Sequence, residues 1–599
     1  MLAQSPTDIL AAIDAMKRQR PVVLGAALAP SNAVEEILVQ IWAEVLRLDR
    51  VGVTDNFFYL GGDSIQLTQV SARVRDRFGL EIDFAYFFEE PTVAGIARIV
   101  RQEAGEVIAE RVTPLRATLN SICLDTSDWK INSRAVEDIR CLVIPTSDRP
   151  DTLQRCVQSA TANLLRNNRE CRLVIVDDSR SPECAQKNLA IVEELARSCD
   201  LIVQYFGKEE YTTYITELTN GGIVPHVAEF ALRGWSQHGS LAGAGAPRNF
   251  LLLIAAGEAF ASIDDDTESL YARHSNYSPH VKEQNNSVDP STLTPWPDLD
   301  TTLTALPPFD IDFLAVHEQL LGHEFTKLDG RVLTTMFGVA GDCGWGSPSR
   351  FFQYQEQIAR SGIDWNTAIA CRDMLRAPTS YVVSSGAEML MTTAFAATGK
   401  VLLPPFMPVG RGSDLIFGRL MKIIYPSALF GHLPFGVLHT PAAVRKFWLG
   451  EQFRSAGTSD ISTMCLALLK NCPHASEPVE AFHRVGEYLQ DIAQSPLADF
   501  EEMLREQTRV FIEEQLSAIE QQADAVRSMC SMVAEDAVQY CDKARGQLNG
   551  PNAGLPVELL SNDDSSHALA DARKLMGQFG ELLFAWPTIL AIGRDMKLL

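Results

Sequence analysis

The feature that most constrains the fold is a regular alternation of short apolar runs and helical segments in the middle of the chain. One apolar run is Cys141–Ile144, a second ends in Asp177 and Asp178, and a later one ends in the triplet Asp264–Asp266. Strands that alternate with helices at this spacing form a parallel sheet with right-handed crossovers. The pattern predicts an α/β domain whose acidic side chains lie at the carboxyl ends of strands, where open α/β sheets bind ligands.

The triplet Asp264–Asp266 is the first candidate for a binding site. Three adjacent carboxylates repel one another, so a chain that places them at a strand end commonly holds a cation there. A solvated acidic turn explains the triplet equally well when it is considered alone. Motifs elsewhere in the chain favour the cation site.

Length and charge limit what the whole chain can be. At 599 residues it is too long for a single core, and about 150 residues per domain suggests three to four domains. The formal net charge of −24 opposes binding to a polyanion, so nucleic acid is not expected as a partner. The 12 cysteines form no CxxC pair and no zinc-like cluster, which is typical of a reducing compartment.

No targeting or membrane-spanning segment is expected. The first residues lack the basic-then-apolar order of a signal peptide. The longest late apolar run, Leu582–Ile592, is too short to cross a bilayer and contains Pro587. We therefore expect a cytoplasmic protein.

Three motifs near the N-terminus identify a small helical module. They are Asp55–Phe58, Leu60–Ser64 and Phe87–Thr92. With these motifs, residues 31–103 closely resemble a phosphopantetheine carrier domain of nonribosomal peptide and polyketide assembly lines. The resemblance covers the whole module and implies a four-helix bundle.

By this resemblance the Ser64 hydroxyl carries a 4′-phosphopantetheine arm, which a phosphopantetheinyl transferase attaches. Ser64 lies at a predicted helix start, where free backbone N–H groups and the helix dipole favour a phosphate. Gly61 and Gly62 would let the loop approach closely. The alternative is that Ser64 is only an N-cap after a glycine turn.

Four segments of the central region together resemble a glycosyltransferase of the GT-A fold, most like family 2. The resemblance implies a Rossmann-like domain that binds a nucleotide-diphosphate sugar, with a UDP-sugar as the first expectation. The segments occur in the family's order and spacing, and they are Val143–Thr146 with Arg149–Pro150, Val174–Ser179, Gly245–Asn249 and Ile263–Asp266.

The resemblance also implies roles for individual residues. Asp177 or Asp178 would contact the nucleotide base, Arg248 would lie near the diphosphate, and Asp264 would approach the ribose or the sugar. Asp266 would bind Mg²⁺ or Mn²⁺, cations that prefer oxygen ligands and neutralise charge on the departing diphosphate. The other donor-binding candidates are Pro145, Thr146, Arg149 and Asp265.

The segment Leu402–Gly418 resembles the family's acceptor-side acidic motif at a helix start. The family usually has Glu-Asp at this place, but Ser413 replaces the Glu and leaves Asp414 as the candidate general base. Asp414 would take the acceptor proton in a single displacement with inversion. Alternatively, Asp414 is only an early-helix acid that the helix dipole favours.

The resemblance to GT-A enzymes also implies that a histidine near the end of the domain supplies a last metal ligand. His439 is the candidate and His432 is the reserve. The Gln-x-x-Arg-Trp motif of family 2 is absent, as are membrane spans, so a processive membrane polysaccharide synthase is not expected.

Two stretches of the central region predict irregular structure. Residues 271–308 are rich in Asn, Ser, Thr and Pro and predict a long loop, with His274 and His280 at the surface. Gly338–Gly346 predicts a flexible turn. Within it, Trp345 either lines a sugar or acceptor cleft or only packs.

Beyond about residue 445 the sequence is helix-prone. Apolar and small residues from Ile512 to Tyr540 recur at alternating steps of three and four. This seam fits an intramolecular helix bundle better than a homodimer. We find no catalytic motif in this region.

The expected organisation is a carrier domain at 31–103, a linker at 104–136, a GT-A domain at 137–445 and a helical region at 446–599. The leading hypothesis is a metal-dependent inverting glycosyltransferase of natural-product biosynthesis, whose acyl or aminoacyl acceptor is a thioester on its own carrier. In a second hypothesis the acceptor is free or a protein, and the carrier only docks or regulates. In a third, the protein is a non-catalytic carrier scaffold.

Overall fold

The computed structural model describes residues 137–596 except 236–242, 387–389, 443–445 and 561–564, together with parts of residues 28–100. The chain divides into two compact units, Met1–Ile122 and Cys123–Leu599. The predicted linker at 104–136 and the predicted attachment residue Ser64 lie outside the described residues.

The N-terminal unit contains a small hydrophobic core of its own. Helix α2 (Ala33–Leu46) presents Leu38 and Trp42, both fully buried, to this core. The Trp42 ring meets the Phe57 ring edge to face, with 5.0 Å between centroids. Residues 93–100 form a second helix, whose Val93 and Ile96 join the same core. The module is therefore helical, as predicted, where it is described.

The parallel sheet predicted from the apolar runs is present in the second unit. Its strands lie in the order β3-β2-β1-β4, and each neighbouring pair is parallel. The strands and the two helices that follow β1 and β2 are β1 (Cys141–Thr146), α7 (Pro150–Arg166), β2 (Arg172–Asp177), α8 (Pro182–Ser198), β3 (Val203–Phe206) and β4 (Phe260–Ile263).

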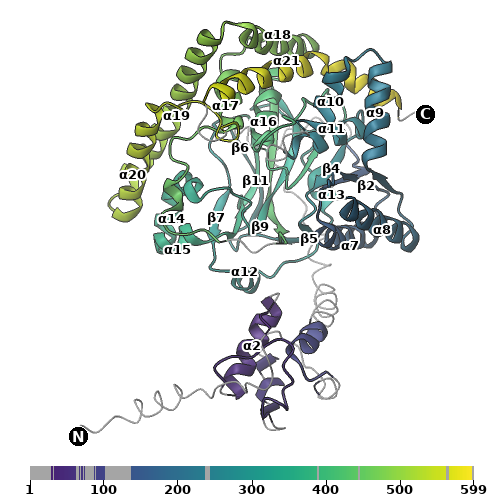
Figure 1. The fold of residues 1–599 in the computed structure, drawn as a ribbon, viewed down its shortest axis with the longest axis vertical. Helices are drawn as coiled ribbons and strands as arrows, with labels where there is room; N and C mark the ends of the chain where they lie inside the picture. The colour runs from purple at the N-terminus through teal and green to yellow at the C-terminus, as the bar shows by residue number, and fades with distance from the viewer. Residues whose placement is uncertain are drawn as a thin grey trace. The chain divides into compact units, whose positions relative to one another are not determined.

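Past β4 the sheet becomes mixed and continues as β12-β9-β13-β11-β6 (Figure 1). Four more strands, β5, β7, β8 and β10, pair beside this path, so the sheet has 13 strands among the described residues. The long neighbours β9 and β13 are parallel to each other. The remaining strands are β5 (Thr267–Ala272), β6 (Ser278–Gln284), β7 (Thr292–Pro295), β8 (Glu324–Phe325), β9 (Gly330–Asp342), β10 (Asp373–Ala377), β11 (Ser380–Ser384), β12 (Ala394–Ala397) and β13 (Ala428–His439).

The prediction of a long loop at residues 271–308 is wrong. This stretch contains β6, β7 and the helix α12 (Leu299–Ala305). Its polar composition is misleading because β6 is the last strand of the sheet and is only half-buried. His280 is exposed, as predicted, but His274 is buried, with its Nε2 3.1 Å from the carbonyl oxygens of Thr292 and Ala377.

The prediction of a flexible turn at Gly338–Gly346 is also wrong for its first half. Strand β9 continues to Asp342. A Cβ atom on Gly338 would lie 1.9 Å from the carbonyl oxygen of Arg376 on the neighbouring strand β10. The glycine is therefore explained by close approach of two strands and not by flexibility.

Helices cover the sheet and continue beyond it into the C-terminal region (Figure 1). Those between β3 and β13 are α9 (Lys208–Asn220), α10 (Pro225–Arg233), α11 (Gly245–Ile254), α13 (Phe313–Glu318), α14 (Gln355–Ser361), α15 (Trp365–Ala370) and α16 (Ser413–Ile424). Those after β13 are α17 (Ile461–Leu469), α18 (Pro478–Gln494), α19 (Leu497–Val526), α20 (Ser531–Leu548) and α21 (Ser565–Met596).

The C-terminal helices share a hydrophobic core with the sheet domain. Helices α18 and α21 lie side by side, and α21 also contacts α10 and α11 (Figure 1). Trp586 of α21 is fully buried in the core that contains Leu253 of α11, and its Nε1 donates to the carbonyl oxygen of Leu403 at 2.7 Å. The helical region after residue 445 is therefore packed as part of the larger unit.

The heptad-like seam packs within the chain, as the preferred prediction stated. Ile512, Leu516 and Ile519 of α19 are buried in one cluster with Val533 and Ala537 of α20. This cluster also contains aromatic residues of the sheet domain, so the seam is already covered.

One described helical segment, His567–Met596, is long and apolar enough to cross a membrane by length and composition alone. Half of its most apolar window is buried inside the protein. A core helix of a soluble protein passes the same test, so this is weak evidence for a membrane span.

Trp586 offers a test of this shared core. We expect Trp586→Ala to lower the free energy of unfolding by about 3–5 kcal/mol, because it removes a large buried side chain and leaves the Leu403 carbonyl without its donor. Phe584→Ala on the same helix, where the ring is 42% exposed, should cost much less. Chemical denaturation of both variants measures the difference, and equal losses would contradict the packing described.

Candidate functional site

The loop before Ser64 in the N-terminal unit needs glycine at two successive positions. Gly61 has φ +90°, a conformation that other residues rarely adopt. A Cβ atom on Gly62 would lie 2.3 Å from the Phe57 ring, so no larger residue fits without displacing that ring. Asn56 accepts a hydrogen bond from the Phe58 N–H at 3.0 Å and so fixes the turn before it. The predicted close approach of this loop is confirmed up to Gly62.

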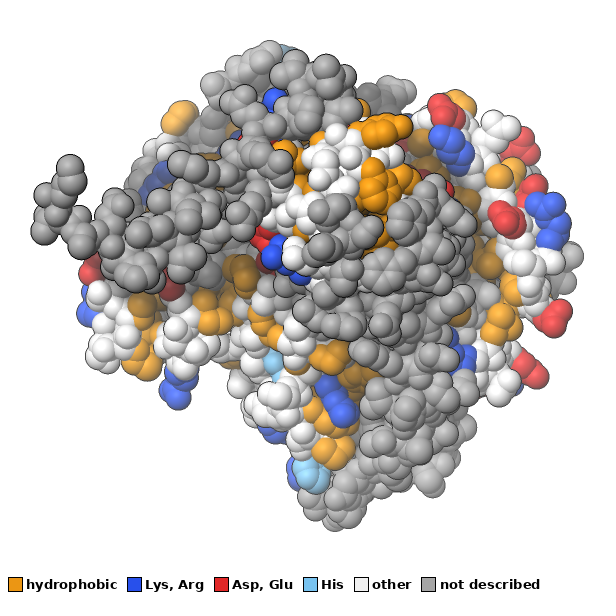
Figure 2. Space-filling model, turned by 90° about the horizontal axis from the view of Figure 1, so that it is seen from below, with side chains coloured by type: hydrophobic (Ala, Val, Ile, Leu, Met, Phe, Trp, Pro, Cys, Tyr) orange, Lys and Arg blue, Asp and Glu red, His pale blue; other side chains and the backbone are white. Residues whose placement is uncertain are grey.

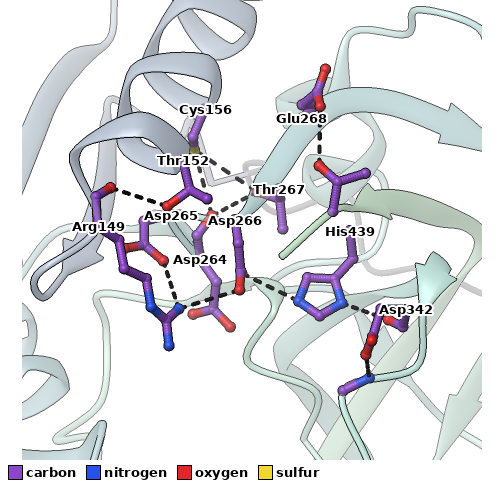
Figure 3. A network of polar contacts seen from close by, with 12 residues as sticks. Arg149, Thr152, Cys156, Asp264, Asp265, Asp266, Thr267, Glu268, Asp342 and His439 are labelled. Carbon is purple, nitrogen blue, oxygen red and sulfur yellow. Dashed lines mark hydrogen bonds and ion pairs between the residues drawn. The ribbon is translucent and has the colours of Figure 1, made fainter. Parts of the chain in front are cut away.

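In the larger unit, the acidic triplet forms a tight turn between two strands. Strand β4 ends at Ile263 and β5 begins at Thr267. The Thr267 N–H and hydroxyl both donate to the Asp264 carbonyl oxygen, at 3.1 and 2.8 Å. Figure 3 shows the three carboxylates of this acid turn together with their partners from other segments.

Residues at the end of β1 hold Asp265. The Thr146 hydroxyl donates to Asp265 Oδ2 at 2.7 Å. Arg149, the N-cap residue of α7, lies 3.2 Å from Asp265 Oδ1 and 3.3 Å from Asp266 Oδ2. Burial raises the pKa of Asp265 to about 6, although Thr146 and Arg149 oppose the shift. The register of β1 beside β4 brings these residues together.

Asp266 pairs with His439, the predicted metal-site partner. The two side chains are 3.2 Å apart, from Oδ1 to Nε2, and both are largely buried. Sheet register explains the contact, because His439 pairs with Thr267 on β5 and with Gly341 on β9. Burial would lower the pKa of His439, but Asp266 and the Asp342 carbonyl raise it to about 9. Burial likewise would raise the pKa of Asp266, but His439 and Arg149 lower it below its usual value.

The other ring nitrogen of His439 is also fixed. Its Nδ1 lies 2.5 Å from the Asp342 carbonyl oxygen. The Asp342 carboxylate in turn makes a buried two-point ion pair with Arg372, at 2.9 Å from Nε and from Nη2. A histidine whose Nδ1–H is donated to a carbonyl presents Nε2 as a free ligand once its proton is lost.

Arg248 connects the acid turn with the helix start that carries Asp414. Its Nη2 donates to Asp264 Oδ1 at 2.7 Å, and its Nε is buried without a hydrogen-bond partner among the described residues. Burial raises the pKa of Asp414, and Arg248 is the largest influence that lowers it. Burial also raises the pKa of Asp264.

Close packing of α11 against the chain before α16 creates this arrangement. A Cβ atom on Gly245 would lie 1.8 Å from the carbonyl oxygen of Met407. The Asn249 side chain donates to the carbonyl oxygen of Phe406 at 3.0 Å and accepts from its N–H at 2.7 Å. Asp414 then follows as the second residue of α16, so the predicted helix start is confirmed.

The adjacent residues Asp177 and Asp178 differ in their surroundings. The Asp177 carboxylate is held by hydrogen bonds within the protein, whereas the Asp178 carboxylate is available to bind a ligand. Asp177 is buried and accepts hydrogen bonds from the Ser179 N–H, from the Asn188 amide and from the Tyr205 hydroxyl, at 2.7–2.9 Å. The Asp178 carboxylate receives no hydrogen bond from the described part of the chain. Burial raises the pKa of Asp178 to about 6.

Some predicted residues do not join the site. His432 is buried seven residues earlier on β13, paired in register with Met336 and Val382. Trp345 stacks on Tyr354 at 5.8 Å and meets Phe351 edge to face at 5.1 Å, which favours packing over a cleft wall. Pro145 lies in β1 beside Thr146 and has no N–H to donate.

Sequence reasoning missed the residues that support the acid turn from β5 and α7. Arg155 of α7 donates to Glu268 Oε1 at 3.1 Å and to the Thr440 carbonyl at 2.8 Å, and the Thr440 N–H donates to the Asp266 carbonyl at 2.8 Å. Glu268 lies two residues after the triplet, which was the one available signal. Arg155 and Thr440 carry no signal, because their contact depends on long-range pairing.

The oxygen and nitrogen atoms at the acid turn can be compared with the ligands that usually coordinate a divalent cation. Among the described residues, no three His, Cys, Asp or Glu side chains are arranged as a complete metal site. Asp266 and His439 supply one oxygen and one nitrogen facing each other. Mg²⁺ is commonly held by one or two protein ligands together with substrate phosphates, so this pair fits a cation that binds with its substrate.

Comparison with known proteins gives matches to the N-terminal unit. Residues 36–100 match the family described as phosphopantetheine attachment site. A linear gramicidin synthase of Brevibacillus parabrevis is 45% identical over 74 residues, which are 12% of this chain and 2% of that protein. The dimodular nonribosomal peptide synthase of Bacillus subtilis (strain 168) is 39% identical over 89 residues, 15% and 4% of the two chains. The chain thus spans only a few per cent of these relatives.

A solved structure gives a similar match. A chain of the structure titled "Structure of the Phosphopantetheine Transferase Sfp in Complex with Coenzyme A and a Peptidyl Carrier Protein" is 36% identical, over 12% of this chain and 97% of that chain, with a TM-score of 0.12.

The Asp266–His439 pair predicts a pH dependence of stability in the metal-free protein. Because the pKa of His439 is raised from 6.5 to about 9, the pair stabilises fully below pH 6.5 and is lost as pH rises through 9. The free energy of unfolding should fall by at most about 3 kcal/mol, since each pKa unit corresponds to 1.36 kcal/mol. We expect Asp266→Asn to flatten this decline, measured by urea unfolding with a chelator present. Asp491→Asn, at an exposed position of α18, should leave it unchanged. Parallel declines in all three proteins would contradict the pairing.

Proposed function

Because residues 36–100 contain a phosphopantetheine carrier domain of the nonribosomal-peptide type, we propose that the chain joins this carrier to a glycosyltransferase. In this proposal the larger unit is a GT-A domain that transfers a sugar from a nucleotide-diphosphate sugar, first of all a UDP-sugar. The acceptor is an acyl or aminoacyl group held as a thioester on the 4′-phosphopantetheine arm of Ser64. A phosphopantetheinyl transferase attaches the arm.

The observation that supports this proposal best is the arrangement of four separate chain segments around the acid turn. Thr146 and Arg149 lie at the end of β1 and just after it, Arg248 lies in the first turn of α11, and His439 ends β13. Asp414, the second residue of α16, interacts electrostatically with Arg248. Such a cluster at the carboxyl edge of a parallel sheet is the usual place of a nucleotide ligand. The order of these segments along the chain is that of the family it resembles.

The nucleotide sugar would bind through side chains whose hydrogen-bonding capacity is not already used within the protein. Asp178 would meet the nucleotide base, because Asp177 is already saturated with hydrogen bonds. Arg248 has a buried Nε–H without a partner, which suits a phosphate oxygen of the diphosphate. Arg149 is 54% exposed, so it can turn from Asp265 and Asp266 towards an incoming anion.

Mg²⁺ or Mn²⁺ would be held by Asp266 and His439 and would neutralise charge on the departing diphosphate. Asp266 presents a carboxylate kept ionised by its neighbours, and His439 presents Nε2 while the Asp342 carbonyl holds Nδ1. His432 lies away from the acid turn along β13, so His439 is the better of the two candidates.

Asp414 is the proposed general base. Its raised pKa makes it a better proton acceptor than an exposed aspartate, and Arg248 opposes part of this rise. Asp414 takes the proton of the acceptor hydroxyl or amine as that atom bonds to the anomeric carbon. The bond from this carbon to the diphosphate oxygen breaks, and the nucleoside diphosphate leaves. The anomeric carbon of the transferred sugar then has the inverted configuration. Tethering would raise the local acceptor concentration to about the millimolar range.

Substitutions of Asp414 and Asp266 test the catalytic proposal. We expect Asp414→Asn to lower the rate of transfer by about 10²–10⁴-fold while donor binding is kept, because only proton acceptance is removed. Asp266→Asn should instead weaken Mn²⁺-dependent donor binding. Calorimetry and a sugar-transfer assay separate the two effects, and Asp491→Asn on α18 is the control. Transfer and donor hydrolysis that are unchanged in Asp266→Asn would contradict the assigned metal ligand, whereas their absence from the wild-type chain would favour the non-catalytic scaffold.

Replacement of Ser64 tests the role of the carrier. Ser64→Ala cannot carry an arm, so glycosylation of an acceptor loaded on the carrier should be lost while donor hydrolysis continues. Intact-mass analysis of the loaded chain, offered a panel of sugar nucleotides, measures the product. Undiminished glycosylation of the acceptor in Ser64→Ala would show that tethering is not obligatory and that the acceptor is free or a protein.

A further inference from the structure

A second hollow in the larger unit lies at the opposite end of β5 from the acid turn. The strand begins directly after Asp266 and ends at Ala272, so the two places are about 20 Å apart at 3.3 Å per residue. The hollow has a volume of about 350 Å³. It is lined chiefly by Arg273, His274, Tyr277, Leu306, Pro307 and Phe309.

The charged group in this pocket is Arg273, and its guanidinium lies over two aromatic rings. Its guanidinium carbon lies 4.5 Å from the centroid of Tyr277 and 5.3 Å from that of Phe309. Both rings pack against the buried Phe435 of β13, at 5.7 and 6.0 Å between centroids. The Phe309 backbone is fixed in turn by two hydrogen bonds of 2.9 Å with Tyr271. The guanidinium therefore rests on a rigid aromatic support.

Arg273 differs from other arginines that contact aromatic rings in the larger unit. Arg372 lies over Phe447 and Arg376 over Trp345, and each also pairs with a buried aspartate, Asp342 or Asp289. Arg273 has no hydrogen bond or ion pair with any described residue. Acidic side chains outnumber basic ones 76 to 52 in this chain, so a half-buried arginine without a carboxylate is unusual.

The rest of the pocket supplies apolar walls and no second charge. His274 is committed to the carbonyl oxygens of Thr292 and Ala377, and burial lowers its pKa, so it is neutral. Leu306 and Pro307 contribute aliphatic surface beside the rings. On the face shown in Figure 2, described acidic and basic side chains are interspersed among hydrophobic ones, and no continuous basic area is visible among them. Recognition by this pocket would therefore rest on one guanidinium with apolar surroundings.

We propose that this pocket binds a phosphate ester joined to a short branched apolar segment, as at the phosphate end of 4′-phosphopantetheine. A guanidinium that packs on aromatic rings still offers its N–H edge, which matches two oxygens of a phosphate. The carbon next to the phosphate-bearing CH₂ of phosphopantetheine carries two methyl groups, which suit the walls formed by Leu306 and Pro307. The carrier domain of the same chain bears this group. The inference does not depend on the sugar-transfer reaction.

Two soluble probes that differ only in the phosphate test the proposal. The full-length Ser64→Ala chain, which cannot carry its own arm, is titrated with 4′-phosphopantetheine and with pantetheine by calorimetry. We expect the phosphorylated probe to bind at least about 10-fold more tightly, and Arg273→Gln to abolish that difference. Arg197→Gln on the exposed face of α8 is the matched control. Equal binding of the two probes, or unchanged binding in Arg273→Gln, would overturn the proposal.

A second variant keeps Arg273 and the aromatic support in place. Pro307 is exposed at the pocket, so Pro307→Glu would set a carboxylate near the guanidinium without removing a buried group. It should weaken binding of 4′-phosphopantetheine and leave the thermal unfolding temperature unchanged. Unaltered affinity in Pro307→Glu would contradict the assigned pocket even if Arg273→Gln fails to fold.

The wild-type chain loaded with its own arm distinguishes the two sources of the phosphate ester. If the carrier arm is the ligand, soluble 4′-phosphopantetheine should bind the loaded chain more weakly than Ser64→Ala, because the tethered group competes. Equal affinity for both chains would overturn the assignment to the carrier arm and leave a site for a soluble phosphate ester.

Discussion

The arrangement of the central site depends on the register of β13 between β5 and β9. This register sets His439 opposite Thr267 on one side and Gly341 on the other, so Asp266 and the Asp342 carbonyl reach its two ring nitrogens. A slip of one residue would turn the imidazole to the other face of the sheet. A contact between residues more than 170 positions apart therefore depends on the pairing of whole strands.

The same place has to contain three adjacent carboxylates in a chain that is already strongly acidic. Each of the three acids pairs with one cationic side chain: Asp264 with Arg248, Asp265 with Arg149 and Asp266 with His439. The three cations differ in freedom, because the Arg248 and His439 side chains are under 10% exposed whereas Arg149 is 54% exposed. A ligand with negative charge can therefore recruit Arg149 at less cost than the two buried partners.

Sequence patterns were sufficient wherever a local rule decides the structure. The strands β1, β2 and β4 follow from apolar runs at the predicted spacing, and Asp414 follows from a helix start, whereas α9 and α10 were not predicted. Predictions from sequence patterns were wrong where contacts with residues distant in the sequence determine the structure. The polar strand β6 is tolerated because it is a sheet edge, Gly338 serves close strand contact, and His274 is buried by carbonyls of β7 and by the end of β10. Arg155 and Thr440 support the acid turn without any motif.

The C-terminal helices pack against the helices that carry Asp414 and Arg248, although they carry no catalytic motif. Ile461 of α17 is buried in the same core as Ile416 and Phe417 of α16, the helix that begins with Ser413 and Asp414. Trp586 of α21 binds the Leu403 carbonyl, three residues before Phe406, whose backbone holds Asn249 beside Arg248. The chain segments that carry Arg248 and Asp414 are thus both supported by residues after 445. Loosening of α17 or α21 would move the candidate base relative to the candidate diphosphate ligand, so these helices act as positioning elements of the central domain.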